Sequence, residues 1–182
     1  MNNNIKAILL TISGSFFAVL MESLIRSAQY DSNVYTIGFL RFFFGLIIIF
    51  PYLIKKKFIP YKTKNFKFYF IRGLFNLPMM ILGFGALVYV PFEQFKALHF
   101  LSPIIVVLLS FVIFREKVYM YRIMALVIGF IGMLIIVRPG IVDFNIGTIM
   151  ILISLTFWSL IIIVSKFVSK DDSPITMVTY QY

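Results

Sequence analysis

Six long apolar stretches follow one another along this chain, and this pattern limits the fold more than any other feature. A helix needs about 20 apolar residues to cross a bilayer, and six stretches meet that length: 7–28, 34–53, 69–90, 94–114, 118–137 and 146–165. Charged residues make up 13% of the chain, whereas an ordinary soluble domain has about 25%. The sequence therefore predicts an all-α polytopic membrane protein.

The first and sixth stretches resemble each other at an offset of 140 residues. Placing Arg26 opposite Lys166 also places Phe17 opposite Phe157, Leu20 opposite Leu160, Asp31 opposite Asp171 and Thr36 opposite Thr176. Five spans lie between one start and the next, so the second copy enters the membrane from the opposite side, as in inverted-repeat carriers. We therefore predict a first five-helix repeat at 1–140 and the beginning of a second, inverted repeat at 141–182.

A seventh apolar stretch begins near Pro174, and the chain ends about eight residues into it, at Tyr182. The backbone of a span that stopped inside lipid would lack hydrogen-bond partners. The sequence therefore predicts a piece of a longer carrier, truncated after six spans and the start of a seventh.

Basic residues are concentrated in every second connection between the stretches. Loops rich in Lys and Arg stay in the cytoplasm, and the connection between the second and third stretches contains six lysines: Lys55, Lys56, Lys57, Lys62, Lys64 and Lys67. The connections at 29–33 and 91–93 contain no basic residue. This asymmetry predicts a cytoplasmic amino terminus in a bacterial inner membrane, and it explains the net charge of +10 without a nucleic-acid partner.

The chain has no cysteine, so a single reporter cysteine can test this orientation. We expect a cysteine placed between Lys57 and Lys62 to stay unlabelled when an impermeant maleimide is added to intact cells, because the lysine-rich loop lies inside. A cysteine in the 29–33 connection should be labelled under the same conditions and serves as the control. Labelling of the first position from outside would show that the predicted topology is wrong.

Two opposite charges lie deep inside neighbouring spans. Arg41 is roughly 10 Å from the outer end of the second span at 1.5 Å per residue, and Glu22 lies at a similar depth in the first. A charge near the bilayer centre costs about 2.5 to 3.5 kcal/mol, so an ion retained there is a functional hypothesis. We predict that Glu22 pairs with Arg41. The alternative is a contact between Glu22 and Arg26, one helical turn away.

Three further residues are predicted to line a cavity together with Glu22 and Arg41: Asn76, His99 and Trp158. The alternatives are a hydrogen bond between helices for His99 and a packing role for Trp158, the sole tryptophan. His99 is the sole histidine, and without cysteine the chain offers no predicted metal site or cofactor site.

Two patterns predict how the spans bend and pack. Pro78 and Pro103 each remove a backbone hydrogen bond and can bend the third and fourth spans beside a cavity. The small residues Ala125, Gly129 and Gly132 share one face of the fifth span, which favours close packing between helices.

Four stretches give the chain a family resemblance. They are RFFFGLIIIFP at 41–51, ALHFLSPIIVVLLS at 97–110, FREK at 114–117 and GFIGMLIIVRPG at 129–140. In them the chain resembles the EamA-type drug/metabolite transporter superfamily, in which two five-helix halves form a ten-helix carrier. The resemblance implies that Glu116 is the family's acidic residue between the fourth and fifth helices. Members usually have Gly before it, where this chain has Arg115.

Charges, topology and resemblance together predict a secondary transporter that moves a small polar or zwitterionic metabolite across the cytoplasmic membrane by alternating access. The pieces RFFF and IRG (71–73) are similar to S-adenosylmethionine uptake carriers, which implies an amino acid or an S-adenosylmethionine-like substrate. The sequence does not decide whether transport is coupled to an ion or proton, or whether the protein forms a homodimer. The alternatives are a non-transporting membrane scaffold and a membrane-embedded enzyme, although the sequence shows no cluster of acids or histidines for catalysis.

Overall fold

The computed structural model describes residues 3–55, 63–115, 119–137 and 145–181, and these residues form helices and short connections without a strand. The helices are α1 (Asn3–Ala28), α2 (Val34–Lys55), α3 (Phe66–Ala86), α4 (Phe92–His99), α5 (Leu101–Phe114), α6 (Met120–Val137), α7 (Ile146–Val168) and α8 (Pro174–Thr179). Within these ranges six helical segments are long and apolar enough to cross a membrane, with α4 and α5 forming one of them. The predicted all-α polytopic membrane fold is confirmed.

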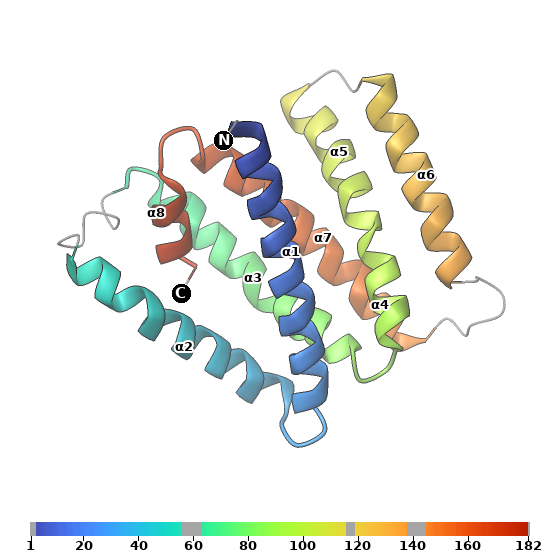
Figure 1. Ribbon diagram of the computed structural model, residues 1–182, viewed down its shortest axis with the longest axis horizontal. Helices are drawn as coiled ribbons and strands as arrows, with labels where there is room; N and C mark the ends of the chain where they lie inside the picture. Colours follow the sequence, from blue (N-terminus) through green and yellow to red (C-terminus); the bar gives the residue numbers. More distant parts are fainter. Residues whose placement is uncertain (1–2, 56–62, 116–118, 138–144, 182) are drawn as a thin grey trace.

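Helices α3 and α7 form the centre of the structure and make its most extensive helix–helix contact. Helix α2 packs on α3, α5 packs on α7, and α4 contacts both α6 and α7. Figure 1 shows that α1 runs from the amino terminus toward the α1–α2 loop, whereas α7 runs in the opposite direction. Most large apolar side chains of α1 are exposed, as expected for a helix that faces lipid or further helices.

The helix boundaries repeat at the offset that the sequence indicated. Helix α1 ends at Ala28 and α7 ends at Val168, while α2 begins at Val34 and α8 begins at Pro174. Both pairs of boundaries are separated by the same 140 positions. The two connections thus have equal lengths and lie at the ends of helices that run in opposite directions (Figure 1).

The two connections also cap the following helix in the same way. The side chain of Asn33 accepts a hydrogen bond from the backbone N–H of Thr36 at 2.9 Å, at the start of α2. At the start of α8, the hydroxyl of Ser173 accepts from the backbone N–H of Thr176 at 3.3 Å. Such caps satisfy backbone donors that have no partner in the first helical turn. The aligned threonines therefore have the same structural role.

The fourth predicted span is divided into α4 and α5 at Phe100. Pro103 has no N–H to donate to the carbonyl of His99, and its ring crowds that carbonyl. The interruption therefore lies about one turn before the proline, whereas the sequence predicted only that Pro103 can bend this span. Helix α3, in contrast, continues through Pro78 as one helix.

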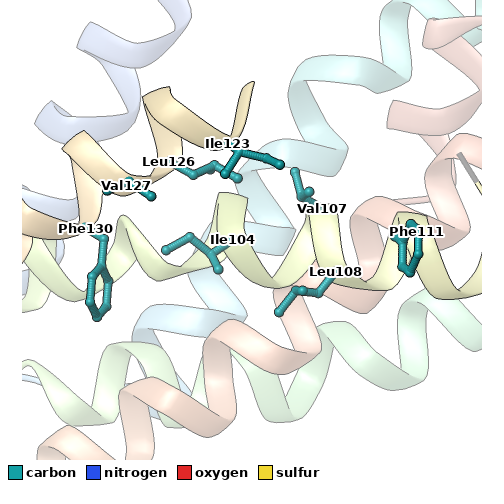
Figure 2. Close-up of a pocket in the computed structure, with 8 residues that line it drawn as sticks. All are labelled: Ile104, Val107, Leu108, Phe111, Ile123, Leu126, Val127 and Phe130. Atoms are coloured by element: carbon teal, nitrogen blue, oxygen red, sulfur yellow. The ribbon is translucent and has the colours of Figure 1, made fainter. Parts of the chain in front are cut away.

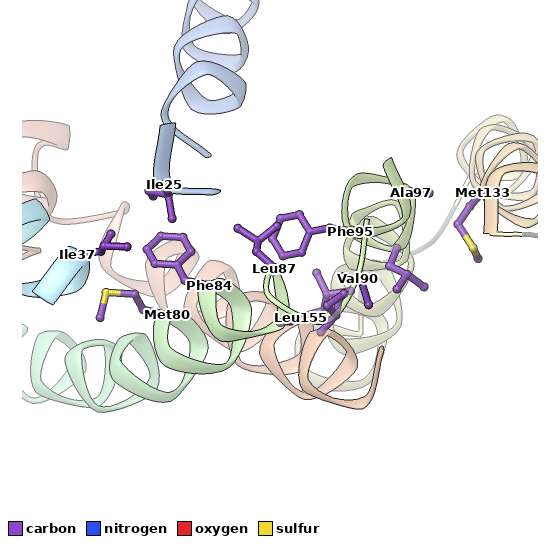
Figure 3. Close-up of a cluster of buried hydrophobic side chains, with 13 residues drawn as sticks. Ile25, Ile37, Met80, Phe84, Leu87, Val90, Phe95, Ala97, Met133 and Leu155 are labelled. Carbon is purple, nitrogen blue, oxygen red and sulfur yellow. The ribbon is translucent and has the colours of Figure 1, made fainter. Parts of the chain in front are cut away.

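Buried apolar side chains gather at the end of the bundle where α1 and α3 end and where α2 begins. Figure 3 shows these side chains meeting from several helices. The cluster consists of Ile25, Ile37, Met80, Phe84, Ala86, Leu87, Val90, Phe95, Ala97, Leu98, Met133, Ile151 and Leu155. This end, which the basic loops predict to be external, is therefore closed by tight apolar packing.

Small residues bring α3 and α7 together but leave α6 apart. A Cβ atom on Gly83 of α3 would lie 2.8 Å from the Ser154 hydroxyl of α7. The predicted packing role of Ala125, Gly129 and Gly132 is wrong in the described part of the chain, since no neighbouring atom lies within 4 Å of a Cβ at either glycine and Ala125 is exposed. Helix α6 instead buries Met133.

Arg115 ends α5 in a left-handed conformation, with a φ of 52° and a ψ of 33°. Glycine adopts this conformation without steric cost, which is why it commonly follows the end of a helix. Arg115 therefore adopts a backbone conformation that glycine favours at a helix end. Glu116 itself lies outside the described residues.

Candidate functional site

Trp158 of α7 lies between two neighbouring cavities and lines both of them. The first has a volume of about 410 Å³ and is lined by His99, Ser102, Pro103, Val106, Val107, Arg122, Leu126, Trp158 and Ile162. The second has a volume of about 160 Å³ and is lined by Arg72, Asn76, Trp158, Ile161, Ile162, Ser165 and Gln181. Ligand pockets typically measure roughly 300 to 1,000 Å³, so the space around Trp158 is large enough for a small metabolite.

Three serine side chains of α7 form hydrogen bonds with backbone carbonyls of the protein itself. The hydroxyls of Ser159 and Ser165 donate to backbone carbonyls of the preceding turn, at 2.8 and 2.7 Å. The hydroxyl of Ser154 crosses to α3 and donates to the carbonyl of Met79 at 2.8 Å. In lipid, unsatisfied polar groups are costly. The bond from Ser154 therefore holds α7 against α3, whereas the bonds of Ser159 and Ser165 satisfy their hydroxyls within α7.

The second cavity is bordered by an arginine that joins α3 to α8. The Arg72 guanidinium donates to the carbonyl of Met177 and to the side-chain oxygen of Gln181, both at 3.2 Å. Asn76 lies one turn further along α3 and lines the same cavity. Arg72 and Asn76 of α3 therefore line this cavity together with Trp158 and Gln181, which belong to the second predicted repeat.

His99 ends α4 and lines the first cavity. Its Nδ1 atom lies 2.8 Å from the carbonyl oxygen of Phe95, one turn earlier in the same helix, so Nδ1–H donates to this carbonyl. The hydrogen bond is therefore within α4, whereas the alternative interpretation placed it between helices. Arg122 of α6 lines the cavity together with His99.

Glu22 forms a salt bridge with Lys96 of α4, so its partner differs from the predicted Arg41. The Glu22 and Lys96 side chains are 17% and 29% exposed, respectively. The Arg26 guanidinium instead donates to the carbonyls of Leu87 and Val90 at the end of α3. Neither of the two predicted pairings of Glu22, with Arg41 or with Arg26, is therefore present among the described residues. The order of the helices along the chain does not show that α4, which carries Lys96, lies beside Glu22 of α1.

The Arg41 guanidinium lies over the ring of Phe84, with its carbon 5.4 Å from the ring centroid. A cation over an aromatic face is attracted by the ring's electron density. Neither Arg41 nor Glu22 lines the two Trp158 cavities, whereas Asn76, His99 and Trp158 do. The contact of these last three with a substrate, and the same role for Glu22 and Arg41, stay predictions.

An apolar groove between α5 and α6 is larger than either Trp158 cavity but has different chemistry. Figure 2 shows that its labelled side chains carry carbon atoms alone. They are Ile104, Val107, Leu108, Phe111, Ile123, Leu126, Val127 and Phe130. A polar metabolite would find no hydrogen-bond partner there, so the groove is not a candidate site for such a substrate.

Sequence reasoning missed Arg122, Arg72 and Gln181 as residues around Trp158. Arg72 and Arg122 lie close to the ends of their spans, where arginine commonly extends toward the membrane surface. Gln181 lies just after α8, far from Trp158 along the sequence. The available signal was that Ser154 and Ser165 share one helical face with Trp158, which indicates the side of α7 that faces other helices.

Comparison with known proteins assigns the chain to a protein family. The EamA-like transporter family matches residues 5–138, which is more than half of the sequence. The chain belongs to this family. The predicted membership of the drug/metabolite transporter superfamily is thereby confirmed.

Relatives of this EamA-like protein are named as transporters, not as enzymes. A riboflavin transporter of Vibrio cholerae is 31% identical over 177 residues, covering 94% of this chain and 58% of that protein. A riboflavin transporter of Brucella anthropi is 24% identical over 144 residues, covering 79% of this chain and 51% of that protein. An S-adenosylmethionine uptake transporter of Rickettsia prowazekii is 29% identical over 147 residues, covering 80% and 50%.

The EamA-like chain thus spans between 50% and 58% of the length of these relatives. No solved structure matches it significantly.

Proposed function

We propose that this EamA-like protein moves a small metabolite across the cytoplasmic membrane by alternating access, with its substrate site around Trp158. The observation that carries this proposal is the pair of cavities that Trp158 joins, because they place hydrogen-bonding groups next to an aromatic surface inside the bundle. Carriers of inverted-repeat type bind substrate at the interface between their repeats, near the middle of the membrane. Trp158 is about midway along α7, the first helix of the second predicted repeat.

We also propose the division into a first repeat at 1–140 and an inverted second repeat that begins at 141. The equal offsets of the helix boundaries, the matching caps and the opposite directions of α1 and α7 support this division. A non-transporting scaffold would explain the helix packing but gives no reason for arginine and asparagine side chains beside a cavity. We retain the proposal of a cytoplasmic amino terminus in an inner membrane.

The charge around Trp158 favours one substrate class over another. The charged residues that line the two cavities, within the described part of the chain, are Arg122 and Arg72, and neither cavity is lined by an acid there. Arginine side chains repel a cation in a medium of low dielectric constant. We therefore propose a planar heteroaromatic substrate without net positive charge, such as riboflavin, in preference to the S-adenosylmethionine-like cation that the sequence suggested.

Replacing Trp158 by alanine should reduce uptake of labelled riboflavin by the full-length carrier roughly tenfold, because stacking of a base on an aromatic side chain contributes about 1 to 3 kcal/mol. Trp158→Phe keeps an aromatic face and should retain most of the uptake. Membrane-inserted yield, measured in parallel, separates lost folding from lost binding. Unchanged uptake by well-folded Trp158→Ala would exclude Trp158 from the site, and preferential uptake of S-adenosylmethionine would contradict the proposed substrate class.

A further inference from the structure

A carboxylate in the α7–α8 connection collects three hydrogen bonds from the beginning of α3. Oδ2 of Asp172 accepts from the hydroxyl of Thr63 at 2.5 Å, from the side-chain amide of Asn65 at 3.2 Å and from the hydroxyl of Tyr69 at 3.1 Å. The three donors come from the first predicted repeat and the acceptor comes from the second. We call these four residues the Asp172 latch.

Further contacts between α3 and the α8 segment surround the latch. The rings of Tyr69 and Tyr180 stack at a centroid distance of 4.3 Å and an interplanar angle of 18°. Arg72 donates to Met177 and Gln181, one turn deeper in the bundle. Tyr69 is 4% exposed, so the latch covers the beginning of α3 and includes a buried side chain.

The latch and the apolar core close opposite ends of the same bundle. Arg72 and Gln181, which lie directly beneath the latch, line the second Trp158 cavity. The other end is closed by the apolar cluster around Phe84, Leu87 and Phe95. The hydrogen-bonding groups of the latch can bond to water when this end opens, whereas separating the apolar cluster would expose apolar surface that gains no such partner. The Trp158 cavity is therefore easier to open at the latch.

We propose that the Asp172 latch is the gate at the end of the carrier that the basic loops predict to be cytoplasmic. This inference rests on the proposed transport function, since alternating access requires the two repeats to separate at each end in turn. Asp172 is the positioning residue, because one carboxylate oxygen receives all three bonds. Loss of this oxygen destabilises the closed state and therefore shifts the carrier toward the state that is open at this end. The ratio of the two states changes according to the stability that the closed state loses.

Accessibility of a cysteine in the second cavity tests the gate without any substrate. The reporter is Ser165→Cys in the full-length carrier, with any cysteine outside residues 1–182 replaced by serine. Its reaction rate with an impermeant maleimide is measured in inside-out vesicles and in intact cells. We expect Asp172→Ala to raise the rate from the latch side about fivefold or more, given three lost bonds to a charged acceptor, and to lower the rate from the other side.

Tyr69→Phe removes one of the three donors and keeps the stack on Tyr180, so it should raise the latch-side rate by less than Asp172→Ala does. Asp31→Ala is the matched control, because Asp31 is exposed and lies in the corresponding connection of the first repeat, at the opposite end. It should leave the latch-side rate unchanged.

Equal labelling rates in wild type, Asp172→Ala and Tyr69→Phe, at normal membrane-inserted yield, would overturn the gate. If Asp172→Ala does not insert, Tyr69→Phe alone decides. The outcomes for gate and function are separable: a shifted labelling rate in a protein that takes up none of the tested metabolites would support the gate and contradict the transport proposal. Metabolite uptake with unchanged labelling rates would support the transport proposal and contradict the gate.

Discussion

Replacing Lys96 by glutamine should strongly lower the membrane-inserted yield of the protein, because it leaves the Glu22 carboxylate without its ion-pair partner. Removing one member of a buried ion pair costs about 3 to 5 kcal/mol. The Glu22 and Lys96 side chains are 17% and 29% exposed, which places the expected loss of stability near the lower value, about 3 kcal/mol. Glu22→Gln should destabilise the protein similarly, because it leaves the Lys96 ammonium unpaired.

The double variant Glu22→Gln with Lys96→Gln separates an ion pair from two independent effects. It removes both charges, so most of the lost yield and thermal stability in detergent should return. Glu93→Gln changes an exposed acid of the same helix and should have little effect. Strictly additive losses would contradict the pair, and recovery in Glu22→Gln with Arg41→Gln but not with Lys96→Gln would restore the pairing predicted from sequence.

Leucine in place of Gly83 should push α3 away from α7 and lower the stability of the folded protein. A Cβ atom at this position would already lie 2.8 Å from the Ser154 hydroxyl, so the larger side chain must displace a helix. Overpacking typically costs about 1 to 3 kcal/mol, and the loss of the hydrogen bond from Ser154 to Met79 adds about 1 kcal/mol. Thermal stability in detergent measures the effect.

Gly73→Leu is the matched control, because Gly73 lies in the same helix with no neighbouring atom within 4 Å of its Cβ position. It should insert and unfold like the wild-type protein. Gly83→Ala with Ser154→Ala removes the hydroxyl that the new Cβ meets, so its loss of stability should be smaller than the sum of the losses in the two single variants. Equal effects of leucine at Gly83 and at Gly73 would show that α3 and α7 do not meet at this position.

The sequence alone determined those features that depend on residues close together in the chain. The apolar stretches and the disturbance of the fourth span by Pro103 follow from length and from backbone geometry within one or two turns. The family was also predictable, because its motifs are continuous runs of residues. The offset of 140 positions between the ends of α1 and α7 could also be read from sequence, because it is carried by residues within these two helices and the connections after them.

Which faces meet was decided by the tertiary structure. A polar or small residue indicates that its side of a helix avoids lipid, but it does not identify the neighbouring helix. For this reason Glu22 was assigned to Arg41, on the next helix along the chain, whereas the fold brings Lys96 to it. The same reason explains why Gly83 packs against α7 while a Cβ atom at Gly129 or Gly132 would have no neighbouring atom within 4 Å. The bonds of Asp172 to Thr63, Asn65 and Tyr69 join positions more than 100 residues apart, and such contacts are set by how the helices cross, because no local rule of backbone geometry links them.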